Sequence, residues 1–283
     1  MIRPIGICAT HMECRSLKES VPVLTDLLAF EKIAEDPGEA TLKHPNTDWL
    51  LVVHEAGDDA PAKPMHNHWG VRVAHNEEVD AAYEHLNANK QKYGLKQVGK
   101  PLYNHGSYSL YFVEPGTNGW EIECYESAMR RPSLLDRVGG VRAPHWSEPL
   151  PAERFPGRGY VPQGFTHGTL ACRSIETARA FYRDVMGLEV HQANDHVVYL
   201  KHPATRCYVV CAERPEWQAF SPNFRFTVAV ESLEALEEAH RRLEEAGSRT
   251  GLTELGAIER KGAATAFLLR DPDRNWWEVS AGN

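Results

Sequence analysis

Long apolar runs are missing from this sequence of 283 residues. No stretch of about 18 apolar residues occurs, so a typical membrane-spanning helix is excluded. The opening residues, MIRPIGICATHMECRS, also contain no apolar block of the kind that defines a signal peptide. Lysine and arginine form no run, and the formal net charge is −8. We therefore expect neither a nucleic acid nor a membrane as a partner.

Paired cysteines are missing as well. The six cysteines form no CxxC motif and no dense framework. We therefore expect reduced thiols and a cytoplasmic location. The composition is otherwise that of a globular protein, with 42% hydrophobic and 25% charged residues, which excludes general disorder and fibrous repeats.

The sequence repeats itself at a nearly constant offset of 157 or 158 residues. The matching segments are LKHPNTDWLLVV from 42 and LKHPATRCYVV from 200, CRSL from 14 and CRSI from 172, and EPGTNGWEI from 114 and DPDRNWWEV from 271. We predict a tandem duplication, with a first copy in residues 1–126, a linker in 127–160 and a second copy in 161–283. The shared LKHP places His44 and His202 at equivalent positions, where we expect a structural turn.

Each copy divides again into two units with one pattern, in which a strand is followed by an amphipathic helix and then by further strands. In the second copy, the strand FTHGTLAC precedes a helix expected from about Ile175 to Met186, and LEALEEAHRRLEEAG forms the later helix. We predict an α+β fold of four βαβββ units. They lie near residues 4–55, 66–125, 163–213 and 223–281.

Two segments of the second copy resemble the vicinal oxygen chelate superfamily, which includes glyoxalases, extradiol ring-cleaving dioxygenases and small resistance proteins. HGTLACRSIETARAFYRDVMGLEV, from His167, is similar to its opening strand and helix, and DPDRNWWEV is similar to its closing turn and strand. The resemblance implies two cupped, barrel-like mixed sheets, each formed by two units. It also implies a metal held by a histidine that opens the first strand of each unit and by a glutamate near the end of a last strand.

Carried over to this sequence, the resemblance implies the metal ligands His68 and Glu121 in the second unit and His167 in the third. Neither copy alone contains the full set. The equivalent positions of His68, Glu121 and His167 in the other copy are occupied by Arg225, Glu278 and Ala9, respectively.

Two pairings of the units could complete the ligand set. In the crossed pairing, which we favour, the second unit pairs with the third, and His68, Glu121 and His167 meet. The first unit then pairs with the fourth, and we expect an internal ion pair between Arg225 and Glu278. In the alternative, the second unit pairs with the first, and His11 supplies the missing ligand. His11 lies two residues beyond Ala9 and is therefore displaced by about 6–7 Å along its strand.

Two imidazoles and one carboxylate leave three adjacent coordination positions open. This set suits non-haem Fe²⁺, which binds a bidentate substrate and O₂ together; Mn²⁺, Zn²⁺ and Ni²⁺ are the alternatives. A glyoxalase-type site would require a fourth ligand from the last strand of the partner unit. That strand, CYVVCAE, offers no acidic residue before Glu213, so the set favours a dioxygenase over an isomerase.

The segment NHGSYSLYFVEPGTNGWE resembles the extradiol dioxygenase signature, through His105, Leu110-Tyr111, Glu114-Pro115 and Glu121. It departs from that signature at Thr117 and in the spacing from His105, which is one residue short. The resemblance implies that Tyr111 hydrogen-bonds the substrate oxygen. His105 is then the candidate acid or base, because an imidazole titrates near physiological pH.

We therefore predict a non-haem Fe²⁺-dependent extradiol-type dioxygenase that cleaves a small aromatic diol, similar to catechol or hydroquinone, with O₂. The alternatives are a metal-dependent glyoxalase-, isomerase- or hydrolase-like enzyme and a non-catalytic protein that binds small molecules. No residue is assigned to an organic cofactor. Homodimers are common in the family, so by analogy a homodimer is one possible assembly, and the sequence does not identify the oligomeric state.

Overall fold

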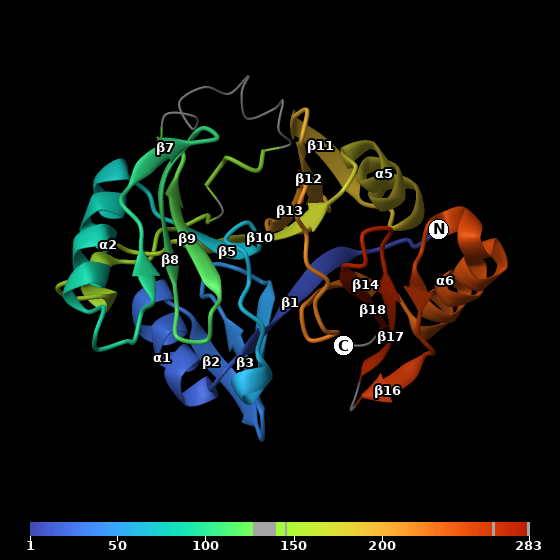
Figure 1. The fold of residues 1–283 in the computed structure, drawn as a ribbon, viewed down its shortest axis with the longest axis horizontal. Coiled ribbons are helices and arrows are strands. Elements are labelled where there is room, and N and C mark those ends of the chain that lie inside the picture. The colour runs from blue at the N-terminus through green and yellow to red at the C-terminus, as the bar shows by residue number, and fades with distance from the viewer. Residues whose placement is uncertain (127–139, 145, 262–263, 282–283) are drawn as a thin grey trace. The chain divides into compact units, whose positions relative to one another are not determined.

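A computed structural model describes residues 1–126, 140–144, 146–261 and 264–281. The chain forms two mixed nine-stranded sheets with helices packed on them, which confirms the predicted α+β fold (Figure 1). Of the predicted linker, residues 127–139 and 145 lie outside the described part. Among the helices that are described, none is long and apolar enough to cross a membrane.

The first copy contains two units of the predicted kind, and the second of them has one additional short strand. The first unit consists of β1 (Gly6–Cys14), α1 (Leu17–Leu28), β2 (Glu31–Asp36), β3 (Glu39–Lys43) and β4 (Leu50–Glu55), followed by the 3₁₀ turn η1 (Gly57–Asp59). The second unit consists of β5 (His68–Arg72), α2 (Asn76–Ala88), β6 (Gln97–Val98), β7 (Leu102–Asn104), β8 (Ser107–Val113) and β9 (Gly119–Cys124).

The second copy repeats this order after the 3₁₀ turn η2 (Ala152–Arg154). The third unit consists of β10 (Gly164–Cys172), α5 (Ile175–Ala180), the π-helical turn η3 (Phe181–Val185), β11 (Glu189–Asn194), β12 (Val197–Lys201) and β13 (Tyr208–Glu213). The fourth consists of β14 (Arg225–Val230), α6 (Leu233–Ala246), η4 (Gly247–Thr250), β15 (Glu254–Leu255), β16 (Glu259–Lys261), β17 (Ala264–Arg270) and β18 (Trp276–Ala281). The predicted helix from Ile175 is therefore present, but its second half is π-helical.

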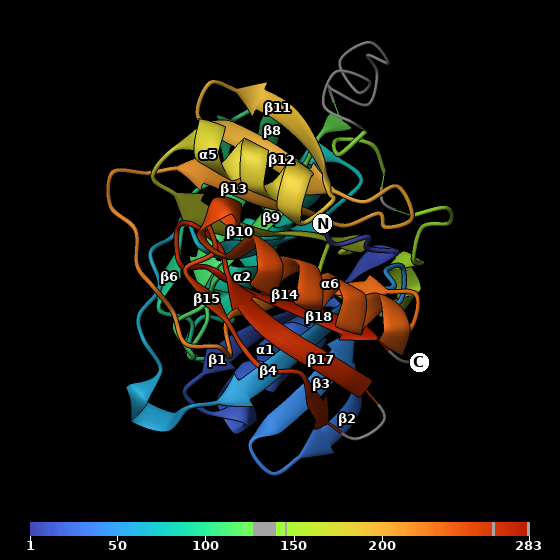
Figure 2. The same cartoon turned by 90° about the vertical axis from the view of Figure 1, so that its right-hand side faces the viewer.

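Equivalent residues stabilise equivalent helix starts in the two copies. The first helical N–H of α1, at Leu17, donates to Glu55 at 2.7 Å, and that of α5, at Ile175, donates to Glu213 at 2.9 Å. The first N–H groups of a helix have no partner within the helix, so an acceptor from a neighbouring strand fixes where the helix begins. Figure 2 shows α5 and α6 lying against the strands of their own units.

The predicted turn at LKHP is present in both copies. The Asn46 N–H donates to His44 Nδ1 at 3.2 Å, and the Ala204 N–H donates to His202 Nδ1 at 3.1 Å. The two histidines differ in burial, since His44 is fully buried and His202 is half-buried. The local sequence therefore determines the turn, whereas burial depends on what packs over it.

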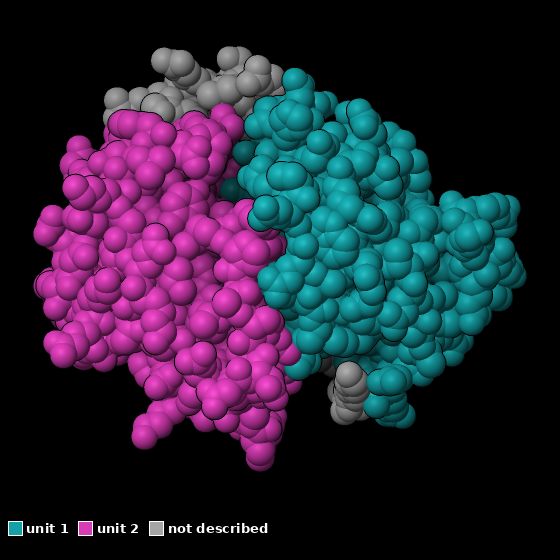
Figure 3. All heavy atoms as spheres, in the orientation of Figure 1, with its two compact units in different colours: residues 1–11, 169–283 teal, residues 12–168 magenta. Residues whose placement is uncertain are grey.

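The chain divides into two compact units, coloured in Figure 3: unit 1 comprises residues 1–11 and 169–283, and unit 2 comprises residues 12–168. Within unit 2, the strand order is β10-β5-β9-β8-β6 in one sheet and β1-β4-β3-β2 in the other. Within unit 1, the orders are β15-β17-β18-β14-β1 and β11-β12-β13-β10. Strands β1 and β10 contribute residues to both units.

The register of the opening strands shows the crossed pairing. In unit 2, β10 runs antiparallel to β5 and pairs His167 with Gly70, while β9 runs parallel to β5 and pairs Glu121 with Gly70. In unit 1, β1 pairs with β14 in the same way, and β14 runs parallel to β18. Of the four βαβββ units, the second (β5–β9) thus pairs with the third (β10–β13), and the first (β1–β4) pairs with the fourth (β14–β18).

The core of unit 2 lies on one face of these strands. Trp69 of β5, Trp120 of β9 and Phe165 of β10 are almost fully buried, and Phe165 stacks on Trp49 with ring centroids 4.8 Å apart. Side chains alternate between the faces of a strand, so the residues next to Trp69 and Trp120 along their strands point to the opposite face. The aromatic core therefore fixes the strands whose other face carries Glu121 and its neighbours.

Candidate metal site

Three predicted ligands come together on β5, β9 and β10 of unit 2. Glu121 Oε2 lies 3.3 Å from His68 Nε2 and 3.3 Å from His167 Nε2, and the two Nε2 atoms are 3.4 Å apart. The side chains of Glu121 and His167 are 1% and 3% exposed, whereas that of His68 is 12% exposed. Across the described residues, this is the group of His, Cys, Asp and Glu side chains that could hold a metal ion.

A glycine makes room for the candidate ligand His167. Gly70 is the register partner of both His167 and Glu121, and a Cβ atom added to Gly70 would lie 2.1 Å from His167 Cε1. Any other residue at this position would displace the imidazole ring. The sequence interpretation missed Gly70, although a glycine inside a buried strand is itself a signal of close approach.

A β-bulge sets the direction of the His167 side chain. The register between β10 and β5 shifts between Phe165 and His167, which leaves Thr166 as the extra residue. Thr166 Oγ1 donates to the Gly70 carbonyl at 3.0 Å. A bulge re-aims the side chains next to it, so it places the imidazole over Gly70.

The Nδ1 atom of each histidine has a partner outside the cluster. His68 Nδ1 donates to the Met65 carbonyl at 2.7 Å, and His167 Nδ1 lies 3.0 Å from Thr166 Oγ1. Such contacts fix the orientation of a ligand imidazole. Both rings therefore present Nε2 to Glu121.

These residues fit a divalent cation. Two donors that bind one ion at about 2.1 Å and at a right angle are about 3 Å apart, close to the separations observed here.

Burial alone would raise the pKa of Glu121, but hydrogen bonds from His167 and His68 hold that pKa well below its usual value. Burial would lower the pKa of His167, yet the charge of Glu123 and a hydrogen bond to Glu121 raise it to about 9. The two carboxylates thus stabilise a positive charge at His167, and a cation bound at Nε2 would take the place of that proton.

A buried ion pair lies beside the candidate ligands. Arg72 and Glu123 are almost completely buried, and the Arg72 guanidinium donates to Glu123 Oε1 at 2.5 and 3.0 Å. Burial opposes ionisation, but the charge of Arg72 lowers the pKa of Glu123 to about 2. Glu123 Oε1 also lies 3.0 Å from Thr166 Oγ1. The sequence interpretation did not identify Arg72, because its partner becomes visible only when β5 and β9 are paired.

The predicted catalytic residues His105 and Tyr111 form a chain of hydrogen bonds to Glu121. The Tyr111 hydroxyl donates to Glu121 Oε1 at 2.8 Å and lies 3.0 Å from His105 Nε2. Burial and the charge of Glu121 raise the pKa of Tyr111 far above its usual value, so the phenol keeps its proton. The side chain of His105 is 37% exposed and forms the outer end of the chain.

Residues 164–279 match the sequence model of the Glyoxalase/Bleomycin resistance protein/Dioxygenase superfamily. The matched segment covers most of the second copy of the duplication. The resemblance to the vicinal oxygen chelate superfamily is thereby confirmed. The fold is typical of metalloenzymes such as dioxygenases and glyoxalases. In the comparison with curated proteins, the sequence has no match.

Solved structures have a similar fold over almost the whole chain. A "putative dioxygenase" from Bacillus subtilis subsp. subtilis str. 168 is similar with a TM-score of 0.65 at 11% identity, covering 100% of this chain and 86% of that chain. A glyoxalase I mutant from Zea mays gives a TM-score of 0.64 at 12% identity, covering 98% and 92%. Glyoxalase I from Zea mays gives 0.58 at 13% identity, covering 98% and 92%. At these identities, the comparison shows the fold.

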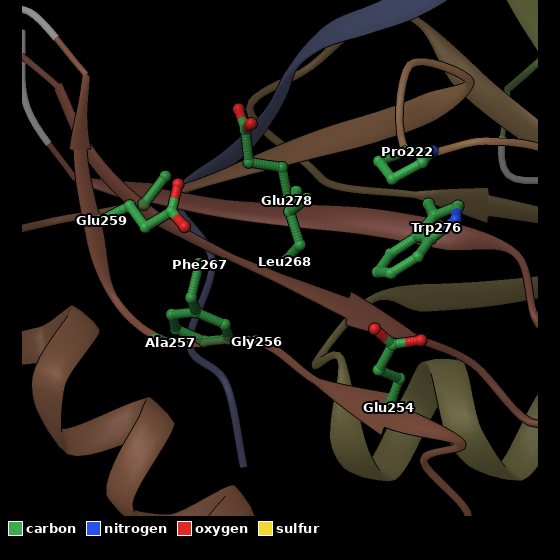
Figure 4. A pocket seen from close by; sticks show the side chains of 10 residues that line it. Pro222, Glu254, Gly256, Ala257, Glu259, Phe267, Leu268, Trp276 and Glu278 are labelled. Carbon is green, nitrogen blue, oxygen red and sulfur yellow. The ribbon is translucent and has the colours of Figure 1, made fainter.

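Unit 1 contains the equivalent positions of the candidate metal site with different side chains. The expected ion pair is present, since Arg225 lies 2.9 Å from Glu278. Thr227 occupies the position of Gly70, and its hydroxyl donates to Glu278 at 3.2 Å. A cavity of about 250 Å³ opens beside Glu278 (Figure 4). It is lined by Pro222, Glu254, Gly256, Ala257, Glu259, Ala266, Phe267, Leu268, Trp276 and Glu278.

His11, the alternative third ligand, lies on β1 in unit 1. It pairs in register with Arg225, and its Nε2 is 3.3 Å from Thr227 Oγ1. It is buried and belongs to the surroundings of the Arg225–Glu278 ion pair. The metal-ligand group found among the described residues does not include it.

Proposed function

We propose that the protein is an Fe²⁺-dependent extradiol-type dioxygenase that cleaves a small aromatic diol, similar to catechol or hydroquinone, with O₂. The observation that carries the proposal is a three-donor cluster, His68, Glu121 and His167, with a Tyr111–His105 pair hydrogen-bonded to its carboxylate. An Fe²⁺ ion in this set would offer adjacent positions for both diol oxygens and for O₂. Glu123, whose Oε1 is paired with Arg72, does not belong to this donor group.

The hydrogen bonds around Tyr111 define where protons lie. A carboxylate only accepts, so the single hydroxyl hydrogen of Tyr111 points to Glu121, and His105 Nε2 must be the donor toward Tyr111. His105 Nδ1 lies 3.4 Å from the Tyr125 hydroxyl, which can donate to it. In this state, His105 thus carries its hydrogen on Nε2 and can accept a proton at Nδ1. Tyr111 can hydrogen-bond a substrate oxygen bound beside Glu121.

The proposal is tested by purifying the protein without oxygen, loading it with Fe²⁺, and measuring metal content and O₂ consumption with catechol and hydroquinone. We expect one iron per chain and O₂ uptake that matches the formation of a ring-opened product. The variant Glu121→Ala should lose both iron and O₂ uptake, whereas Glu278→Ala, at the equivalent position in unit 1, should retain both.

Other outcomes would replace the proposal. Turnover of a substrate in the absence of O₂, with Zn²⁺, Ni²⁺ or Mn²⁺ as the active ion, would show an isomerase- or hydrolase-like enzyme. Tight binding of a diol without turnover under any metal would show a binding protein.

A further inference from the structure

His105 sits in a backbone conformation that side chains other than glycine adopt rarely. It forms a two-residue turn with Gly106, between the paired residues Asn104 of β7 and Ser107 of β8. The φ angles are 38° at His105 and 94° at Gly106, as in the type I′ turns that join short hairpins. A positive φ at a non-glycine residue persists when its surroundings hold it. The contacts of this turn therefore determine where the imidazole points.

Arg142 provides the contact that holds the turn. Its guanidinium donates to the His105 carbonyl at 3.0 Å, and its Nη1 lies 3.0 Å from the place where a Cβ on Gly106 would be. The same guanidinium lies over the Tyr125 ring, 5.4 Å from the centroid. Arg142 is 9% exposed, so water does not replace these contacts readily.

The backbone on either side of Arg142 is hydrogen-bonded to Arg72, which lies beside the candidate metal site. Arg72 donates from one nitrogen to the carbonyls of Val141 at 3.0 Å and Ala143 at 2.6 Å. The same Arg72 pairs with Glu123. A contiguous set of contacts within unit 2 therefore leads from the ligand His167, through Glu123 and Arg72, to the segment that carries Arg142.

From these contacts we infer that Arg142 is a positioning residue for His105. Its hydrogen bond to the His105 carbonyl keeps the turn in the left-handed conformation from which Nε2 reaches Tyr111 and Nδ1 reaches Tyr125. Residues 140–143, within the predicted linker between the copies, are thus part of the site. The catalytic meaning of this inference rests on the proposed function, whereas the positioning itself does not.

The test uses the protein loaded with Zn²⁺, which is diamagnetic, and labelled with ¹⁵N in its histidines. The variants are Arg142→Met, Arg142→Lys and the control Arg154→Met. The control makes the same change elsewhere in residues 127–160, at an exposed arginine that pairs with Glu31. The His105 signal is assigned by its loss in His105→Gln. Zinc content and imidazole NMR spectra are measured for each protein.

We expect one defined tautomer for His105 in the wild type, with hydrogen on Nε2, and the same spectrum in Arg154→Met. In Arg142→Met, the tautomers should mix and the Nε2 hydrogen should exchange with water about tenfold faster, the effect of losing one hydrogen bond. Arg142→Lys retains a cation that can reach the carbonyl and should restore most of the wild-type signal. Zinc content should stay at one per chain in all four proteins.

An unchanged His105 signal in Arg142→Met would overturn the inference. If Arg142→Met fails to fold, Arg142→Ala, which also removes the donor, takes its place. Mixed His105 tautomers with unchanged zinc content then support positioning, and a wild-type His105 spectrum overturns it. If the Fe²⁺ protein consumes no O₂ with any diol while the His105 spectra behave as expected, the proposed function fails and the positioning by Arg142 stands.

Discussion

The site on β5, β9 and β10 and its equivalent on β1, β14 and β18 have the same strand register but stabilise their glutamate differently. In unit 2, Glu121 faces two imidazoles, whose Nε2 atoms can bind a cation from solution. In unit 1, Glu278 faces Arg225, a cation that is part of the chain. An arginine in the place of a histidine thus supplies the charge that a metal would supply and removes the need for one.

The two sites also differ in where they have space for a side chain. In unit 2, Gly70 leaves space that the His167 ring fills. In unit 1, Thr227 occupies the glycine position and Ala9 occupies the histidine position. The larger side chain of the pair is therefore on β14 in unit 1, whereas in unit 2 it is on β10. The room for a histidine ring on the opening strand thus depends on the residue paired with it on the neighbouring strand.

The largest expected effect comes from the ligands themselves. Glu121→Ala and His68→Ala should each weaken binding of Fe²⁺ or Zn²⁺ by more than about 100-fold, since loss of an outer partner alone costs 10- to 100-fold. The matched change Glu278→Ala should leave metal binding intact. Calorimetric titration of the metal-free proteins measures all three. Metal loss in Glu278→Ala with retention in Glu121→Ala would show that the metal site lies in unit 1.

The next largest effect is a pH dependence of stability that we expect from His44 and not from its equivalent, His202. His44 Nε2 donates to the Pro162 carbonyl at 3.1 Å, and burial lowers the pKa of His44 to about 4. A histidine with a lowered folded-state pKa resists protonation, so the free energy of unfolding should fall as pH drops from 6.5 to 4. The loss should reach about 3 kcal/mol below pH 4.

Denaturant titrations across this pH range measure that slope. The variant His44→Asn keeps an acceptor for the turn without a titrating group, and its stability should depend less on pH. His202→Asn, the same change at the half-exposed equivalent, should leave the slope as it is. Equal slopes in wild type and His44→Asn would mean that His44 is not the group responsible.

A smaller effect tests the space between the strands. Gly70→Ala places a Cβ where the His167 ring lies, so the ring must move and metal affinity should fall about 10- to 100-fold, as for a lost outer partner. Thr227→Ala is the control at the equivalent position, where the side chain already has a Cβ atom, and metal affinity should not change. An unchanged metal affinity in Gly70→Ala would mean that the His167 ring can bind the metal from a different position.

Much of this architecture could be predicted from the sequence because its signals are local. The four units follow from period-2 and period-3.6 patterns, and the ligand pattern of His68, Glu121 and His167 led to the crossed pairing that the register shows. What the sequence interpretation missed depends on register or on irregular backbone. Arg72 becomes the partner of Glu123 only through strand pairing, and Arg142 lies in a turn where no periodicity marks the side chain.

The last prediction rebuilds the missing site in unit 1. The combination Ala9→His, Arg225→His and Thr227→Gly introduces the two imidazoles and the space for one of them beside Glu278. We expect the metal content to rise from one to two ions per chain, measured by elemental analysis after dialysis. Without Thr227→Gly, the two histidines should add no second ion, because the Thr227 side chain occupies the space that the ring needs.

The rebuilt site should bind more weakly than the native one, by about 10- to 100-fold, because outer partners that orient the ligands are missing. The positions of Arg72, Glu123 and Thr166 are occupied in unit 1 by Ala229, Ser280 and Cys8, respectively. If the triple variant folds and takes up no second ion, exchange of side chains at the three positions is insufficient. The buried Arg72–Glu123 pair would then be a requirement for metal binding in unit 2, beyond the ligands themselves.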